Sequence, residues 1–384
     1  MNIITLIILS FLAAFISIYA IIPVSLRNNI GIDHPGKRKL HETPVPRVGG
    51  VGIFLAMLMS LFFMSVNDKI ISILIAGLII FAVGLYDDIK GVHWPVKMIG
   101  VGLAATITIF HGDMTVRHIG TIFGYGNLNL GMWAIPFTYL CILGVVSAIN
   151  LCDGLNGLVA GISLIIFIFL AIFSYMDARY NFMYISLAMS GGLAAFLIYN
   201  YPSGRIFMGD SGSHLIGFTI AIISIAVFQR SSPYQPMTPV VLLAIPIFDT
   251  IRVMMLRIIR GRNPFSADNL HIHHILVRAG LSKTKTVLSL WLLTLIFAVT
   301  AYIIRLQSGW EQGVFFMSSL GIIWIFLTIL HDLEANKGEK TLEQTEAAPV
   351  AAGMTFNDSL TDGLLPKTRG IQRKLWQSLL KMIV

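Results

Sequence analysis

Charged side chains are scarce in this chain of 384 residues. Asp, Glu, Lys and Arg together make up 12% of it, whereas soluble domains contain about 25%. Hydrophobic residues account for 56%, and the mean hydropathy is +0.80. This composition excludes a soluble globular protein and predicts one that is embedded in a membrane.

Cysteine is also rare. The two cysteines, Cys141 and Cys152, lie in or beside one apolar stretch, so the sequence predicts no disulfide framework. No histidine or other base is close to Cys152 in the sequence, which argues against a thiolate nucleophile. The chain also lacks an internal repeat.

Long apolar stretches dominate the chain. A helix needs about 20 apolar residues to cross the hydrocarbon core of a bilayer. Eleven stretches qualify, near residues 3–26, 49–66, 70–86, 95–111, 132–149, 157–176, 182–200, 213–229, 238–256, 286–305 and 313–331. We therefore predict an all-α, polytopic integral membrane protein with about eleven transmembrane helices. The first stretch lacks a basic region and a small-residue cleavage site, so we interpret it as a permanent helix.

The distribution of Lys and Arg predicts the orientation in the membrane. Through residue 331, one alternate set of loops carries 15 of the 20 basic residues. The other set carries Lys69, Arg117, Arg179, Arg230 and Arg305. Because cytoplasmic loops are the more basic ones, the N-terminus is predicted outside and the C-terminus in the cytoplasm. The formal charge of +8 follows from this bias, and no basic soluble domain predicts a nucleic-acid partner.

Composition divides the chain after the last apolar stretch. Residues 1–331 form the predicted transmembrane domain, and the polar residues 332–370 predict a disordered tether. Residues 371–384 place apolar side chains on one helical face, which fits an amphipathic interfacial helix or a docked or frayed terminal stub. In the outside loop, residues 115–130 alternate around Gly124 to Gly126 and predict a short hairpin.

Four polar clusters fall at the predicted cytoplasmic ends of spans, where ionisable groups are costly and often functional. The first contains Asp87 and Asp88. Adjacent carboxylates repel each other, so both stay ionised only beside donors or a cation such as Lys90, Lys97 or Mg²⁺. The alternative is a solvated helix end.

The second and third clusters offer amide and carboxylate oxygens. Asn150, Asp153 and Asn156 are three residues apart and would share one face of a helix, where they could hold a metal or a polar substrate. The alternative is a helix junction softened by glycine. Asp210 lies between Gly209 and Gly212, and a hard cation with phosphate ligands would suit its carboxylate. The competing interpretation of Asp210 is a helix N-cap.

The remaining polar groups are basic. His271, His273 and His274 could bind zinc, but a structural zinc site needs four ligands, often with cysteine, so stabilisation of a phosphate is favoured over a merely His-rich loop. The loop of residues 33–41 carries successive cations that suit a pyrophosphate or an anionic headgroup, or that simply reflect the orientation bias.

Taken together, these residues resemble the polyprenyl-phosphate N-acetylhexosamine-1-phosphate transferases. The resemblance runs in order over roughly residues 1–331. The matching stretches are Asp33–His41, Val48-Gly49-Gly50, Gly84–Asp88, Asn150–Gly157, Asn200–Gly217 and His271–Gly280. It implies transfer of an N-acetylhexosamine 1-phosphate from a UDP-sugar to polyprenyl phosphate in the bilayer, with release of UMP and a need for Mg²⁺ or Mn²⁺.

The resemblance also implies roles for individual residues. Asp210, together with Asp88, looks like the metal site, and Asp87 and Asp88 match the acidic pair that serves the polyprenyl phosphate. Phe207 matches an aromatic residue that stacks on uracil. The other implied substrate-binding residues are Arg38, Lys39, His41, Lys97, Asn150, Asn156 and Asn200. The other implied catalytic residues are Asp153, His271, His273 and His274.

The segment from Pro264 to His274 looks more like the WecA branch of this family than the MraY branch, which favours UDP-N-acetylglucosamine as donor. Asn156 departs from the pattern, because many members carry an aspartate there. Such an enzyme would act at the inner face of a bacterial inner membrane and initiate a cell-surface polysaccharide such as O-antigen. The exact sugar and the oligomeric state, a homodimer included, stay open.

Elementary chemistry agrees with that reaction. A phosphate monoester has a second pKa near 6 and is already a competent nucleophile at neutral pH. Direct attack on the β-phosphate is favoured, with an aspartyl-phosphate route through Asp87 or Asp88 left open. The rival class is a transporter, which would place acidic groups near the bilayer midplane in repeated halves. The acidic groups here lie at span ends instead.

Overall fold

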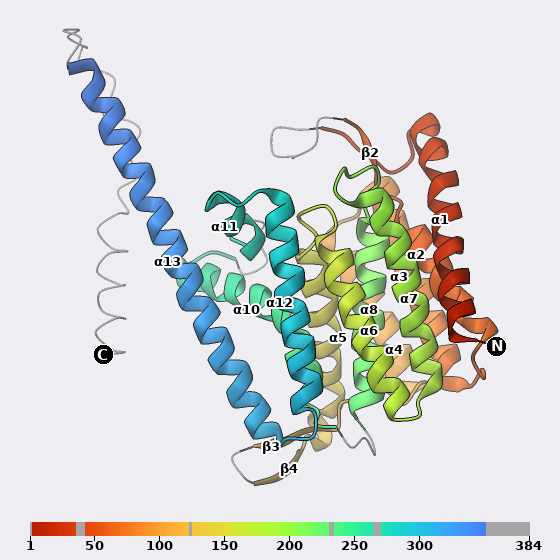
Figure 1. Cartoon of the computed structure of the whole chain (residues 1–384). Coiled ribbons are helices and arrows are strands. Elements are labelled where there is room, and N and C mark those ends of the chain that lie inside the picture. The colour runs from red at the N-terminus through yellow and green to blue at the C-terminus, as the bar shows by residue number, and fades with distance from the viewer. Residues whose placement is uncertain (1, 36–42, 123–124, 230–233, 264–269, 351–384) are drawn as a thin grey trace. The chain divides into compact units, whose positions relative to one another are not determined.

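The computed structural model describes residues 2–35, 43–122, 125–229, 234–263 and 270–350 of the chain (Figure 1). It is helical, and the chain divides into two units, residues 1–331 and 332–384. The longer helices of the first unit are α1 (Ile3–Asn28), α2 (Gly50–Met59), α3 (Asp68–Lys90), α4 (Trp94–Phe110), α5 (Ala134–Leu151), α6 (Leu158–Met176), α7 (Tyr180–Asn200), α8 (Gly209–Phe228), α10 (Ala244–Ile259) and α12 (Lys283–Ile304). The shorter helices are η1 (Ser60–Phe62), η2 (Gly131–Trp133), α9 (Thr238–Leu242) and α11 (Ile272–Arg278).

Eight helices in the described part of the chain are long and apolar enough to cross a membrane, so the protein is a polytopic helical membrane protein. The predicted spans at 49–66, 95–111 and 238–256 contain shorter helices. The number of about eleven spans and the orientation of the termini therefore stay predictions.

The predicted span at 238–256 is divided into α9 and α10 at Leu243. Pro246 has no backbone N–H to donate to residue 242, and its ring would clash with the carbonyl of that residue, which breaks the helix. In Figure 1, α10 runs crosswise to α12.

Helix α8 forms the centre of the first unit. It packs against α2, α3, α5, α6 and α7. Within its most apolar segment of 18 residues, 94% is buried inside the protein. A helix that is apolar on all sides needs such an enclosed position. In contrast, α1 and α12 expose apolar side chains such as Ile16 and Leu292, as expected for helices that face lipid.

Two small antiparallel hairpins occupy opposite ends of the bundle (Figure 1). Strands β3 (His118–Ile122) and β4 (Tyr125–Asn129) pair at one end and confirm the predicted hairpin. The side-chain oxygen of Gln229 accepts hydrogen bonds from the backbone of Arg117 and His118 and holds the hairpin against the end of α8.

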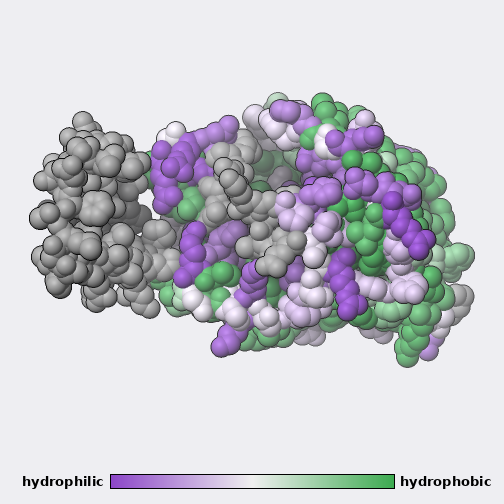
Figure 2. Space-filling view, turned by 90° about the horizontal axis from the view of Figure 1, so that it is seen from above, coloured by the Kyte–Doolittle hydropathy of each residue, from purple (hydrophilic) through white to green (hydrophobic). Residues whose placement is uncertain are grey.

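At the other end, β1 (Ile32–Asp33) pairs with β2 (Val45–Pro46). The chain around β2 is joined to the loop that enters α8: Phe207 N–H donates to Pro46 O at 2.7 Å, and Gly50 N–H donates to Met208 O at 2.9 Å. Figure 2 looks onto this end, where hydrophilic side chains gather beside a hydrophobic rim.

Helix α13 (Gly309–Val350) continues into the second unit. Residues 332–350 belong to this helix, and the disordered tether predicted over residues 332–370 stays a prediction. Residues 351–384 lie outside the described residues, so the rest of the tether and the amphipathic helix stay predictions.

Candidate active site

A cavity of about 760 Å³ opens at the end of the bundle that carries β1 and β2. This is the size of a small-molecule site. Its wall joins segments that are far apart in the sequence. The polar and aromatic residues in that wall are Asp33, Arg47, Asn150, Asp153, Asn156, Asn200, Tyr201, Phe207, Asp210, His274, Arg278, Lys283 and Thr284.

Asp88 caps the helix on which Asp210 lies. Its Oδ1 accepts the backbone N–H of Asp210 at 2.7 Å, and its Oδ2 accepts the backbone N–H and the hydroxyl of Ser211 at 3.0 and 2.6 Å. These N–H groups belong to the first turn of α8 and have no partner within the helix. Asp210 is therefore not the N-cap of α8, which is Met208.

Two glycines allow the close approach that this cap requires. The backbone of Gly84 on α3 lies against Ser211, since a Cβ atom at residue 84 would be 2.5 Å from Ser211 Cα. Gly209 has a φ of +73°, and a Cβ atom there would be 2.3 Å from Asp88 Oδ2. L side chains rarely adopt such a φ. Both positions thus seat the start of α8 on the end of α3.

Asp87 and Asp210 share the ammonium group of Lys97. The Lys97 Nζ lies 2.6 Å from Asp210 Oδ2 and 3.2 Å from Asp87 Oδ2. The guanidinium of Arg47 lies 3.8 Å from both Asp88 and Asp210. Asp87 and Asp88 are 7% and 6% exposed, so the alternative of a solvated helix end is wrong. Two cations instead balance three buried or half-buried carboxylates.

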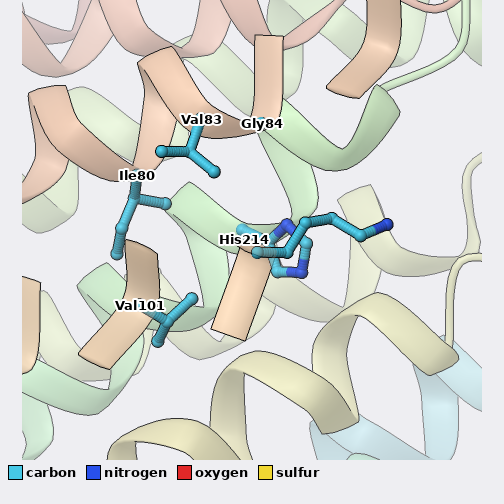
Figure 3. A pocket seen from close by; sticks show the side chains of 6 residues that line it. Ile80, Val83, Gly84, Val101 and His214 are labelled. Atoms are coloured by element: carbon cyan, nitrogen blue, oxygen red, sulfur yellow. The ribbon is translucent and has the colours of Figure 1, made fainter. Parts of the chain in front are cut away.

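A second, much smaller cavity of about 10 Å³ lies behind this cluster, among α3, α4 and α8 (Figure 3). It has room for about one water molecule. His214, one turn after Asp210 on α8, lines it together with Lys97, and His214 Nδ1 lies 3.9 Å from Asp210 Oδ2. The other side chains around this cavity are apolar and come from Ile80, Val83 and Val101.

Asn150, at the end of α5, connects the second cluster to Asp210. Its amide Nδ2 donates to Asp210 Oδ1 at 3.3 Å and to Ser213 Oγ at 2.9 Å. Asp153 and Asn156 follow in the loop before α6, so the prediction that they share one helix face with Asn150 is wrong. Asp153 is exposed to the cavity, although protein surrounds it on most sides. This enclosure, together with the nearby carboxylates of Asp210 and Asp88, raises the pKa of Asp153 to about 7.

The raised pKa of Asp153 predicts a pH dependence of stability. Between the ordinary value of 3.8 and about 7, the folded protein binds more protons at this carboxyl than the unfolded chain does. The free energy of unfolding therefore decreases as the pH rises through this window. We expect the thermal midpoint of the wild type to fall more between pH 5 and pH 8 than that of Asp153→Asn. Parallel pH curves for the two proteins would contradict this expectation.

Asn156 and Asn200 form hydrogen bonds between the loop after α5 and the loop after α7. Asn156 Nδ2 donates to Pro202 O at 3.0 Å. Asn200 is buried, accepts the N–H of Gly157 at its Oδ1 and donates to Ile206 O at 2.7 Å. Both amides thereby hold the loop after α5 against the loop after α7. The amide of Asn156 supplies a hydrogen-bond donor that an aspartate at this position would lack.

We expect Asn156→Asp to lose the bond to Pro202 and to place a carboxylate near its carbonyl oxygen. The bond is exposed, so its loss costs about 0.5–1.5 kcal/mol, and the rate of UMP release that the resemblance implies should fall several-fold. Asn181→Asp is a matched control, because Asn181 Nδ2 makes the same kind of bond to Ser65 O (2.9 Å) at the far end of the bundle. The control should lose stability but keep its activity; equal losses of activity in both variants would contradict a local role for Asn156.

The three histidines lie in succession at the start of α11. The rings of His271 and His273 are 5.9 Å apart and nearly parallel, and those of His273 and His274 are 4.2 Å apart. His274 lines the cavity. His273 is buried, and its burial, with His274 beside it, lowers its pKa to about 3. Its Nε2 has no hydrogen-bond partner among the described residues and faces Gly154.

The structure brings most of the predicted residues together. Those in the cavity wall are Asn150, Asp153, Asn156, Asn200, Phe207, Asp210 and His274. Asp87, Asp88, Lys97, His271 and His273 lie behind that wall, within the described part of the chain. Arg38, Lys39 and His41 lie outside the described residues, as does the segment 264–269. Cys152 is buried, and burial raises the pKa of its thiol well above the ordinary value, as the sequence predicts for an inert cysteine.

Sequence reasoning did not identify several polar residues of this region. Arg47, Arg278 and Lys283 lie in loops or helix ends whose charge was attributed to membrane orientation. His214 and Asp249 lie inside predicted spans. An ionisable group within an apolar span is itself a signal of function, and this signal could have found both.

Several known proteins are similar to this chain. Residues 70–228 match the family model described as glycosyl transferase family 4. The chain is 30% identical over 341 residues to a protein of Bacillus subtilis (strain 168) named probable undecaprenyl-phosphate N-acetylglucosaminyl 1-phosphate transferase, covering 87% of this chain and 94% of that protein.

Two further relatives are named undecaprenyl-phosphate alpha-N-acetylglucosaminyl 1-phosphate transferase. The protein of Haemophilus influenzae is 32% identical over 77% of this chain and 84% of its own length. The protein of Yersinia pestis is 31% identical over 71% of this chain and 75% of its own length. With these relatives and with the acidic, amide and histidine clusters gathered at one cavity, the chain belongs to the polyprenyl-phosphate N-acetylhexosamine-1-phosphate transferase family.

Proposed function

We propose that this protein transfers N-acetylglucosamine 1-phosphate from UDP-N-acetylglucosamine to a polyprenyl phosphate and releases UMP. The observation that carries the proposal is the cavity in which Asp210, Asp153, Arg47 and His274 meet from four separate segments of the chain. Its volume of about 760 Å³ suits a nucleotide sugar. The relatives above are named for this reaction.

Asp87, Asp88 and Asp210 form a donor set that fits Mg²⁺ or Mn²⁺. Each can offer one carboxylate oxygen, and these oxygens lie within 4.8 Å of one another. Hard divalent ions prefer such ligands together with phosphate oxygens. Asp210 is the member that also lines the cavity, so we assign it as the principal ligand. Bound there, the ion would neutralise charge on the diphosphate of the donor.

The protein's own cations lower the repulsion between the two anionic substrates. Arg47 stands at the Asp210 side of the cavity, while Arg278 and Lys283 stand in the wall formed by α11 and α12. Guanidinium groups bind phosphate oxygens with strong, directional hydrogen bonds. These residues can therefore hold the diphosphate of the donor between Asp210 and His274 as the acceptor phosphate approaches.

The geometry supports direct attack of the lipid phosphate. In that step an oxygen of the polyprenyl phosphate bonds to the β-phosphorus of the donor, the bond from this phosphorus to the bridging oxygen breaks, and UMP leaves with that oxygen. An aspartyl-phosphate would require Asp87 or Asp88 to reach the donor, and neither residue lines the cavity. Both oxygens of Asp88 accept hydrogen bonds, and its side chain is 0% exposed. The two oxygens of Asp87 accept Val92 N–H and bind Lys97.

The proposal includes the placement of the site. The basic loops adjoin the end of the bundle that carries the cavity, so the site faces the cytoplasm of a bacterial cell, where UDP-sugars are available. The product would be the lipid-linked first sugar of a cell-surface polysaccharide.

The test is release of UMP by the purified protein in detergent or liposomes, given UDP-N-acetylglucosamine, undecaprenyl phosphate and Mg²⁺. We expect UMP and a lipid-linked sugar diphosphate in equal amounts, and neither product without the lipid or with EDTA. UMP release that needs no lipid acceptor would refute the proposal. A panel with UDP-N-acetylgalactosamine and N-acetylated deoxy-sugars identifies the donor, since related sugars differ by one or two hydroxyl groups that hydrogen bonds can distinguish.

A further inference from the structure

Helix α10 carries a carboxylate that the proposed reaction does not use. Asp249 is 2% exposed and lies outside the wall of the cavity. Its Oδ2 lies 2.8 Å from His271 Nδ1, and its Oδ1 accepts the backbone N–H of Ile272 at 2.9 Å. A buried carboxylate is costly unless its oxygens are paired. Both oxygens of Asp249 are paired with the segment that begins the row of histidines.

Arg252 completes this cluster. Its Nη2 lies 3.4 Å from Asp249 Oδ1 and also donates to the carbonyl of Leu270. Asp249 and Arg252 are one turn apart on α10, and they bind Leu270, His271 and Ile272 in succession. The chain entering α11 is therefore attached to α10 at three consecutive residues.

The segment that α10 holds in place leads directly into the helix that lines the cavity. Ile272 is the first residue of α11, so its bond to Asp249 fixes the start of the helix that presents His274 and Arg278 to the cavity. The ring of His271 lies against that of His273, which lies against that of His274. A displacement of His271 would be transmitted along this row, because packed rings leave little free space.

We propose that Asp249 is a positioning residue for the phosphate-binding side of the active site. It sets the tautomer and orientation of His271 by accepting its Nδ1–H, and it fixes the first turn of α11. Carboxylates orient imidazoles in this way in catalytic triads and metal sites. The inference rests on the proposed function, because it assigns the histidine row and Arg278 to the diphosphate of the donor.

The substitution Asp249→Asn distinguishes the bond of Asp249 to His271 from its bond to Ile272 N–H. The Oδ1 of the asparagine can still accept Ile272 N–H, but its amide nitrogen would face His271 Nδ1 and favour the other tautomer. We expect Asp249→Asn to lower kcat/KM for UMP release about tenfold to a hundredfold. Hydrogen exchange of the α11 amides should stay close to that of the wild type. Asp249→Ala should lose the activity and also speed this exchange.

A double-mutant cycle distinguishes positioning through His271 from a general structural role. In a His271→Ala background, adding Asp249→Asn should cause no further loss of activity, because the group on which it acts is gone. The cycle is measured under single-turnover conditions with excess protein, so that large losses stay measurable. Equal fold-losses with and without the His271 ring would overturn the proposal, as would wild-type kcat/KM in Asp249→Asn.

A second variant covers the case in which Asp249→Asn does not fold. Asp249→Glu keeps the charge and both acceptor oxygens but moves them by one methylene group, so it should be folded and impaired; full activity would count against positioning. Asp177→Asn is the matched control, because Asp177 also pairs with an arginine, Arg179, at the far end of the bundle. UMP release by the wild type tests the proposed function separately, and only the ratios between variants test this inference.

Discussion

Asp210→Asn is expected to lower the rate of UMP release by about a thousandfold, which corresponds to about 4 kcal/mol of transition-state stabilisation. Asp210 is the carboxylate that joins the acidic cluster to the cavity wall. An amide cannot replace the charge that binds a divalent ion and that holds Lys97 at 2.6 Å. The measurement is the single-turnover rate of UMP release at saturating Mg²⁺.

Asp113→Asn is the control for this change. It removes a carboxylate that pairs with Arg117 at the hairpin end of the bundle, and it should leave the rate within twofold of the wild type. A thermal midpoint of Asp210→Asn close to that of the wild type would show that its loss of activity is local. If Asp210→Asn kept more than a tenth of the activity, the assignment of Asp210 as the metal ligand would be wrong.

Asp88→Ala is expected to have the largest effect on stability. It removes the acceptor of three hydrogen bonds at the start of α8, so two buried backbone N–H groups and the hydroxyl of Ser211 lose their partner. Buried donors without partners cost about 1–3 kcal/mol each, and a lost N-cap costs about 0.5–2 kcal/mol. We expect a loss of about 3 kcal/mol in the free energy of unfolding, together with a loss of activity, because Asp210 shares this turn.

The matched control lies on the same helix. Asp68 is exposed in the first turn of α3, at the end opposite Asp88. Asp68→Ala should change the free energy of unfolding by no more than about 0.5 kcal/mol. Thermal unfolding in detergent compares the two variants. A stable but inactive Asp88→Ala protein would assign Asp88 to chemistry alone and would contradict its role as the cap of α8.

The sequence was sufficient to predict the helical membrane fold, because long apolar runs are a local property of the chain. It also predicted the hairpin around Gly124 and the approach of the four polar clusters. It could not predict the break at Leu243, since the length of the apolar run conceals the effect of Pro246. Nor could it predict that the adjacent residues Asp87 and Asp88 have different hydrogen-bond partners.

That difference depends on tertiary contacts. Successive residues on a helix point about 100° apart, so Asp87 meets Lys97 on α4 while Asp88 meets the first turn of α8. Asn150 also depends on a tertiary contact. It lies on a different helix from Asp210 and is 60 residues away along the chain, yet its amide donates to the Asp210 carboxylate. The sequence could not predict the partners of Asp249, because His271 and Ile272 are more than 20 residues away along the chain.

The enclosure of α8 has a consequence for the response of this protein to its lipids. A helix surrounded by other helices has almost no contact with acyl chains, so a change in bilayer thickness acts first on outer helices such as α1 and α12, which tilt to match it. The proposed metal ligand, Asp210, therefore lies on a helix that has little direct contact with the lipid bilayer. Host membranes of different thickness should alter the access of the lipid substrate more than the geometry around Asp210.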